Sequence, residues 1–176
     1  MDPFIKEIQQ INTVEDAINK LNTQTEITPK LNEIINFIIE AHEGQYRKSG
    51  EPYCVHPILV ASITAHFSKD EAIIATALLH DVVEDTHFSL EYVKETWGSD
   101  IAHMVDGLTK IVEIREHEFI ASNDASDSKI ISSALTFRKM LIASIDDVRV
   151  LVVKLCDRLH NMLTLSVLPH NKQRRI

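Results

Sequence analysis

Residues 30–48 read KLNEIINFIIEAHEGQYRK, and their spacing predicts a helix. The apolar side chains recur at steps of three and four residues, so they share one helix face: Leu31, Ile34, Ile35, Ile38 and Ala41. Similar periodicity runs through most of the chain, and no convincing pair of strands is found. Only 4 glycines and 5 prolines argue against a turn-rich β architecture. The sequence therefore predicts an all-α fold, a helical bundle.

Short polar patterns predict where several helices begin and end. Residues 13–16 (TVED) and 68–71 (SKDE) both fit a capping box, in which a Ser or Thr side chain caps the first turn. Ser89 is expected to cap the following helix, and Gly98 is expected to end it.

Three more helices are expected in the second half of the chain. They cover 99–112, with an interruption at Gly107, then 128–145 and 147–163; the β-branched start of the last leaves a short strand as an alternative. Residues 113–128, EIREHEFIASNDASDS, are polar, and this composition predicts one long mobile loop. Long loops in compact helical domains are often functional or disordered, so a lid or regulatory role is one expectation.

Length and composition limit the class of protein. A chain of 176 residues predicts a single domain, here taken as residues 1–176, and a net charge of −8 disfavours nucleic-acid binding. No apolar run approaches the roughly 20 residues that span a bilayer, and no secretion signal is visible. Cys54 and Cys156 are too few for a disulfide framework and are expected to be buried thiols. We expect a cytoplasmic protein without a membrane partner.

The stretch ALLHDVVEDT (77–86) places groups that titrate or bind cations within an apolar sequence. Carboxylates are almost never fully buried unless something pairs with them. If the stretch is one helix, His80 lies above Glu84 and Asp81 lies above Asp85. The adjacent His80 and Asp81 can then reach one ion. A hydrogen-bonded structural pair is the alternative interpretation.

Two other segments supply groups of the same kind. YCVHP (53–57) places His56 before Pro57 at an expected helix start, and KLCDRLHN (154–161) places Asp157 in an apolar helical segment. With the His-Asp pair, this gives two imidazoles and two carboxylates, a mixed shell suited to Mn²⁺, Fe²⁺ or Zn²⁺. An ion that prefers six ligands would keep two positions for water and a substrate oxygen, as hydrolysis requires.

This H…HD…D pattern resembles the HD superfamily of metal-dependent phosphohydrolases. Longer motifs resemble, in order, the hydrolase domain of RelA/SpoT alarmone enzymes: RKSGEPYCVHP (47–57), ALLHDVVEDT (77–86), MVDGLTK (104–110), FRKML (137–141) and DVRVLVVKLCDRLHNMLTL (147–165). The motifs fall within residues 30–165. The resemblance implies an HD-type helical bundle that removes the 3′-pyrophosphate of ppGpp and pppGpp in the stringent response, usually with Mn²⁺.

The resemblance also implies roles for individual residues. The metal ligands would be His56, His80, Asp81 and Asp157, while Glu84 and Asp85 would orient and deprotonate the attacking water. Arg47, Lys48 and Ser49 would pack against the guanine base, and Asn161 and Thr164 would lie near the ribose and base. A carboxylate beside a cation keeps a low pKa, so a base is better placed one step away from the ion.

Two further basic residues have two alternative interpretations. Lys139 and Arg158 either meet phosphate or pair with carboxylates. The remaining histidines are expected at the surface or hydrogen-bonded in the core: His42, His66, His87, His103, His117, His160 and His170.

The chain departs from the family pattern at two positions. Leu163 stands where the family commonly has Arg, and Thr136 where it often has Asn, which affects affinity or specificity more than hydrolysis. NKQRRI (171–176) resembles the beginning of a further helix, so we expect a fragment of a longer SpoT-like enzyme without its synthetase and regulatory domains. A stand-alone small alarmone hydrolase is the alternative.

Two rival functions share much of this pattern. Another HD phosphohydrolase would keep the metal shell and differ at residues 47–49 and 161–164. A domain that binds the alarmone without cleaving it would have lost metal-site residues, whereas here every one is present.

Overall fold

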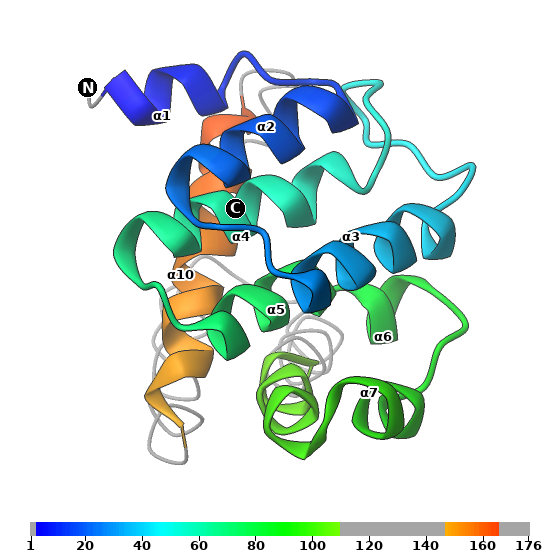
Figure 1. Ribbon diagram of the computed structural model, residues 1–176. Coiled ribbons are helices and arrows are strands. Elements are labelled where there is room, and N and C mark those ends of the chain that lie inside the picture. The colour runs from blue at the N-terminus through cyan, green and yellow to red at the C-terminus, as the bar shows by residue number, and fades with distance from the viewer. Residues whose placement is uncertain (1–2, 110–146, 166–176) are drawn as a thin grey trace, which may run out of the picture.

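A computed structural model describes residues 3–109 and 147–165, and these form helices joined by loops (Figure 1). The helices are α1 (Pro3–Ile8), α2 (Val14–Gln24), α3 (Pro29–Ala41), α4 (Val55–Phe67), α5 (Glu71–Leu79), α6 (Val82–Asp85), α7 (Leu90–Trp97) and α10 (Val148–Leu163). Residues 99–109 are also helical. The only extended pairing in the described residues is one bridge between Tyr46 and Pro52. The prediction of an all-α fold is confirmed.

Most predicted helix ends are observed. The side chain of Thr13 caps α2, that of Ser89 caps α7, and Gly98 ends α7 with a φ of 101°. The start of α5 lies two residues later than expected. Asp70 caps α5 by accepting two backbone N–H groups of the first turn, whereas Ser68 ends α4. A carboxylate also complements the positive end of the helix dipole, which favours Asp70 over Ser68 as the cap.

Helix α3 buries the face that the sequence predicts but is shorter than the pattern suggested. Leu31, Ile34, Ile35 and Ile38 are buried. The helix ends at Ala41 instead of reaching residue 48, because the apolar spacing stops there and the chain turns through Gly44 at a φ of 75°. Residues 42–54 therefore form a loop.

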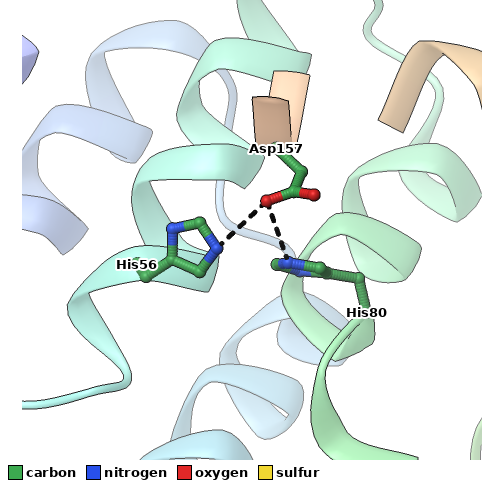
Figure 2. A group of neighbouring side chains, drawn as sticks. All are labelled: His56, His80 and Asp157. Carbon is green, nitrogen blue, oxygen red and sulfur yellow. Dashed lines mark ion pairs between the residues drawn. The ribbon is translucent and has the colours of Figure 1, made fainter. Parts of the chain in front are cut away.

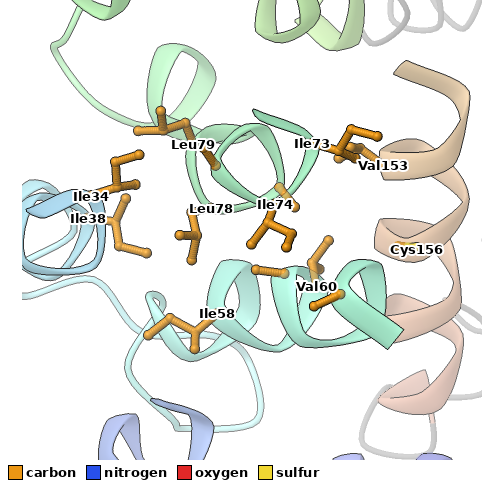
Figure 3. Packing of buried hydrophobic residues seen from close by; sticks show 14 of the residues in the cluster. Ile34, Ile38, Ile58, Val60, Ile73, Ile74, Leu78, Leu79, Val153 and Cys156 are labelled. Carbon is orange, nitrogen blue, oxygen red and sulfur yellow. The ribbon is translucent and has the colours of Figure 1, made fainter. Parts of the chain in front are cut away.

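Helix α4 is the centre of the fold. It packs against α2, α5 and α10, and each of its residues from Val55 to Ala65 is buried. Figure 3 shows its side chains packed against those of α5, with Val60 facing Ile74, and α10 beside both helices. A helix covered on all sides needs apolar residues all round, which explains why α4 lacks a polar face. His56 lies in the first turn of α4, so the packing of this buried helix fixes the position of its backbone.

The stretch ALLHDVVEDT is not one helix, so that prediction is wrong. Helix α5 ends at Leu79, α6 begins at Val82, and His80 and Asp81 form the turn between them. The Nδ1 of His80 lies 2.8 Å from the carbonyl oxygen of Ala77. In a continuous helix that carbonyl would accept the N–H of Asp81, so the imidazole competes with the helical hydrogen bond.

The helix at 99–109 runs through Gly107 without the predicted interruption. A Cβ added at Gly107 would lie 3.0 Å from Cγ2 of Val150 on α10, so glycine here allows two helices to approach closely. Residues 148–163 form one continuous helix, α10, so the alternative of a short strand at its start is wrong. The predicted loop at 113–128 and helix at 128–145 lie outside the described residues.

We predict that Gly107→Ala destabilises the protein. Alanine gains about 1 kcal/mol in helix propensity, but overpacking a buried contact costs about 1–3 kcal/mol. Val150 cannot easily yield, because it is buried and β-branched within a helix. Urea unfolding of Gly107→Ala with and without Val150→Ala measures the coupling. Gly107→Ala should be neutral or stabilising once Val150→Ala has made room; equal effects in both backgrounds would contradict this account.

Candidate metal centre

Three side chains from distant parts of the chain converge at one end of α4. His56 comes from the first turn of α4, His80 from the α5–α6 turn and Asp157 from the middle of α10 (Figure 2). The Oδ1 of Asp157 lies 3.3 Å from Nε2 of His56 and 3.8 Å from Nε2 of His80. One potential ligand atom from each residue lies within 4.8 Å of the others, a spacing at which all three can contact one ion.

Asp81 adds a second carboxylate to this group. Its Oδ1 lies 3.1 Å from Nε2 of His80, and its Oδ2 lies 3.6 Å from Nε2 of His56. Among the described residues the mutually close set contains His56, His80 and Asp157, whereas Asp81 is close to the two imidazoles but is not part of this set. The structure thus brings together all four residues for which the sequence analysis expected a metal-binding role.

The donor set fits a divalent cation. Because Nδ1 of His80 faces a backbone carbonyl, which only accepts, Nδ1 carries the proton of the neutral ring. Its Nε2 is buried without a hydrogen-bond partner among the described residues. The lone pair of this nitrogen is therefore directed at the oxygens of Asp81 and Asp157. Such converging lone pairs repel one another unless a cation lies between them.

The charges of the site are strongly coupled. Burial alone would lower the pKa of His80, but the carboxylates of Asp81 and Asp157 outweigh it and raise this pKa to about 9. Burial likewise opposes ionisation of the two carboxyl groups, yet the imidazoles hold both of their pKa values far below the usual range. Burial lowers the pKa of His56. Without a metal ion, a proton on His80 is therefore the counter-charge of the site.

Asp157 is held from both sides by its own helix. Nζ of Lys154 lies 3.0 Å from Oδ2, and Nδ2 of Asn161 donates to Oδ1 at 2.6 Å. Oδ1 of Asn161 in turn accepts from the guanidinium of Arg47 at 2.8 Å. Lys154 was not predicted to have a role, although its position three residues before Asp157 on a helix is a signal visible in the sequence.

Tyr53 is a second residue that sequence reasoning missed. Its hydroxyl lies 2.9 Å from Oδ2 of Asp81 and also contacts Oδ2 of Asp85, so it bridges the two carboxylates. Burial and these two negative charges raise the pKa of Tyr53, so the phenol keeps its proton. The ring stacks on His42 with centroids 4.8 Å apart. Tyr53 thus connects the loop before α4 to the α5–α6 turn and to α6.

Glu84 and Asp85 lie beside this group on α6, and both are exposed residues. Protein atoms nevertheless remove enough water from the carboxyl group of Glu84 to raise its pKa, and the charge of Asp81 adds to this effect. The resulting pKa is about 7. A carboxyl group with this pKa can both take up and release a proton near neutral pH.

The residues expected near the nucleotide differ in their contacts and in their exposure. Arg47 reaches Asn161, whereas Lys48 is exposed and Ser49 donates to Glu51 at 2.7 Å. The Thr164 hydroxyl bonds to carbonyls of its own helix, one turn beyond His160. Separately, Leu163 packs against the core where the family commonly has Arg. Thr136 and Lys139 lie outside the described residues.

The remaining histidines divide as expected where they are described. His42 and His160 are buried and hydrogen-bonded, and His66, His87 and His103 are exposed. His117 and His170 lie outside the described residues. What the sequence did not reveal is the partner of His160, which is the imidazole of His56. Cys54 and Cys156 are buried free thiols, as predicted.

The sequence profile that describes the HD domain matches residues 35–176. The chain belongs to the HD-domain family. Within the part of the chain that the structure describes, no helix is long and apolar enough to cross a membrane.

Several relatives of this HD domain carry names from alarmone metabolism. A GTP pyrophosphokinase of Myxococcus xanthus is 50% identical over 137 residues, which are 78% of this chain and 17% of that protein. A guanosine-3′,5′-bis(diphosphate) 3′-pyrophosphohydrolase of Haemophilus influenzae is 44% identical over 137 residues, again 78% of this chain and 19% of the relative. One of the same name from Borreliella burgdorferi is 36% identical over 179 residues, 98% of this chain and 25% of the relative.

The fold is also similar to a solved structure, described as a metazoan ortholog of SpoT that hydrolyzes ppGpp and plays a role in starvation responses. The TM-score is 0.62 at 27% identity, covering 84% of this chain and 79% of the other. The HD domain thus resembles SpoT/RelA hydrolases, and it spans about a fifth of the length of the curated relatives.

We predict that the metal-free HD domain loses stability as the pH rises from about 6.5 to 9. The folded-state pKa of His80 is raised to about 9, so its contribution is complete below the unfolded value and vanishes as the folded imidazolium deprotonates. Thermal unfolding in chelator across this range measures the effect. His80→Gln, which cannot titrate, is the control and should show a flatter profile; parallel profiles would contradict the prediction.

Proposed function

We propose that this HD domain is a Mn²⁺-dependent (p)ppGpp 3′-pyrophosphohydrolase, which converts ppGpp to GDP and pppGpp to GTP, releasing pyrophosphate in the stringent response. The observation that carries the proposal is the buried Nε2 of His80, which has no hydrogen-bond partner among the described residues although two carboxylates lie within 3.8 Å of it. The relatives named as pyrophosphohydrolases support the choice of substrate. Buried free thiols are consistent with a reducing compartment such as the cytoplasm.

The metal would be held by His56, His80, Asp81 and Asp157. Two imidazoles and two carboxylates without a thiol suit Mn²⁺, and an ion that prefers six ligands keeps two positions for water and a phosphate oxygen. When bound, the ion lowers the pKa of a water molecule and polarises the phosphorus centre. The neighbouring Lys154 and Asn161 would keep the Asp157 carboxylate in place for this task.

Glu84 would act as the general base. Its pKa of about 7 lets the carboxylate accept a proton from water at neutral pH. Water adds to the phosphorus attached to the ribose 3′ oxygen, and the bond between these two atoms breaks. The 3′ oxygen takes up a proton, so the products are a nucleotide with a free 3′ hydroxyl and pyrophosphate. Asp85, fixed by the Tyr53 hydroxyl, would orient the water.

The nucleotide would bind beside the Arg47–Asn161 contact. A guanidinium plane can stack on a purine, and Arg47 is already fixed by its hydrogen bond to Asn161. Thr164 caps the C-terminal end of α10, three residues after Asn161, and Lys48 and Ser49 directly follow Arg47 as exposed residues of the loop. These residues would contact the ribose and base while the 3′-pyrophosphate extends toward Asp157.

The direct test is pyrophosphate release from ppGpp by the purified chain, with Mn²⁺ and with a chelator. We expect release with Mn²⁺ that stops when the chelator is added. Bound Mn²⁺ without release from ppGpp would overturn the proposed substrate, whereas absence of Mn²⁺ binding would overturn the metal site itself.

We predict that the metal and base roles separate by mutation. Asp157→Asn should abolish both Mn²⁺ binding and turnover, because it removes a charged ligand. Glu84→Gln should keep Mn²⁺ binding and lower kcat by about 10²- to 10⁴-fold, the range for loss of a general base. Isothermal titration with Mn²⁺ and initial rates on ppGpp measure the two effects. If Glu84→Gln lost the metal as Asp157→Asn does, its role as base would be wrong.

Arg47→Lys should raise KM for ppGpp more than it lowers kcat. Lysine keeps the charge but loses the planar group that stacks on a base and donates to Asn161. Arg149→Lys, which makes the same charge-preserving change at the start of α10, eight residues before Asp157, is a matched control. Steady-state kinetics of both variants measure the difference; a selective loss of kcat in Arg47→Lys would instead place Arg47 in the chemical step.

A further inference from the structure

Helix α10 contacts both ring nitrogens of His56. Oδ1 of Asp157 lies 3.3 Å from Nε2, and Nδ1 of His160 lies 2.8 Å from Nδ1. In Figure 2 the ion-pair line to Asp157 leaves one nitrogen of the ring, and the other nitrogen points away from the site. Both imidazoles are 2% exposed, so no bulk water competes for these contacts. The three side chains form a row that ends in the candidate metal centre.

A nitrogen–nitrogen contact of 2.8 Å requires one shared proton. Two bare nitrogens would repel each other, and two N–H groups would collide. Either His56 donates to His160, or His160 donates to His56. In the neutral rings the first arrangement leaves Nε2 of His56 bare, as a metal ligand must be. The second places the proton on Nε2, where it points at Asp157 and blocks coordination.

His80 shows how the same choice is made on the other side of the site. Its Nδ1 faces the carbonyl of Ala77, which has no proton to give, so of the two neutral forms of the ring only the one with a bare Nε2 is compatible with the backbone. Among the described residues the hydrogen-bond partner of Nδ1 of His56 is not a carbonyl but the imidazole of His160, which can donate or accept. The state of His56 therefore depends on the state of His160.

We propose that His160 is a positioning residue that accepts the Nδ1–H of His56 and thereby presents Nε2 of His56 to a divalent cation. This inference rests on the proposed metal site and names a residue outside its ligand set. His160 lies three residues after Asp157, on the same face of α10. One helix thus supplies a ligand and also fixes the ring orientation of another ligand.

Two substitutions distinguish a role of His160 as hydrogen-bond acceptor from a role that only fills space. In His160→Asn, Oδ1 can occupy the position of Nδ1 and accept the same hydrogen bond. In His160→Leu, the volume is kept but the acceptor is lost. Isothermal titration with Mn²⁺ alone, on chelator-treated wild type and both variants, should show about 10- to 100-fold weaker binding for His160→Leu, the usual cost of losing such a partner. His160→Asn should restore most of the affinity.

Imidazole ¹⁵N spectra of the wild type loaded with diamagnetic Zn²⁺ provide a second readout that no folding defect can affect. We expect the proton on Nδ1 of His56 and on Nε2 of His160. A proton on Nδ1 of His160 in the loaded protein would overturn the inference.

The outcomes distinguish the inference from the function on which it rests. If wild type binds Mn²⁺ and folded His160→Leu binds it equally well, the positioning role is wrong and the metal site stands. If His160→Asn is as weak as His160→Leu, the acceptor is not what matters, and the inference also fails. If wild type binds no Mn²⁺, the proposed function fails.

Discussion

The interaction on which the structure depends is the approach of two carboxylates to two buried imidazoles at the end of α4. Bringing carboxylates this close to buried nitrogens is unfavourable unless a cation balances their charge. In the chain alone, a proton on His80 supplies that charge. The helices around α4 are arranged so that His56, His80 and Asp157 meet, and the apolar packing of α4 resists their separation.

The surroundings of the site keep its groups in a defined form. Lys154 and Asn161 contact the two oxygens of Asp157, Tyr53 bridges the carboxylates of Asp81 and Asp85, and Ala77 faces Nδ1 of His80. Each contact restricts orientation or protonation of a group that faces the candidate metal position. This restriction is what separates a catalytic arrangement from a loose cluster of acidic side chains.

Much of the fold was predictable because it follows local rules. The buried face of α3 and the caps of α2 and α7 depend on residues near in sequence. The break between α5 and α6 was not predictable in this way, because the His80 side chain competes for the backbone carbonyl of Ala77 within an apolar run. The packing reason for a glycine at position 107 is the side chain of Val150, which lies far along the chain.

The candidate site shows the same division. Motifs shared with the HD family identified the residues that converge. Contacts between segments distant in sequence, such as Tyr53 with Asp81 or His56 with His160, cannot be read from the residues near either partner. The roles of these residues in catalysis stay predictions.

The α5–α6 turn has a consequence for the order in which the protein folds. His80 and Asp81 lie in a stretch that is close in sequence to α4, but their partner Asp157 lies on α10, 77 residues after His80. Contacts of such separation carry the loop-closure entropy of the intervening chain and tend to form late. An ion that binds only the completed group would act as a reversible cross-link between the α4–α6 segment and α10, and it would slow their separation once the native state has been reached.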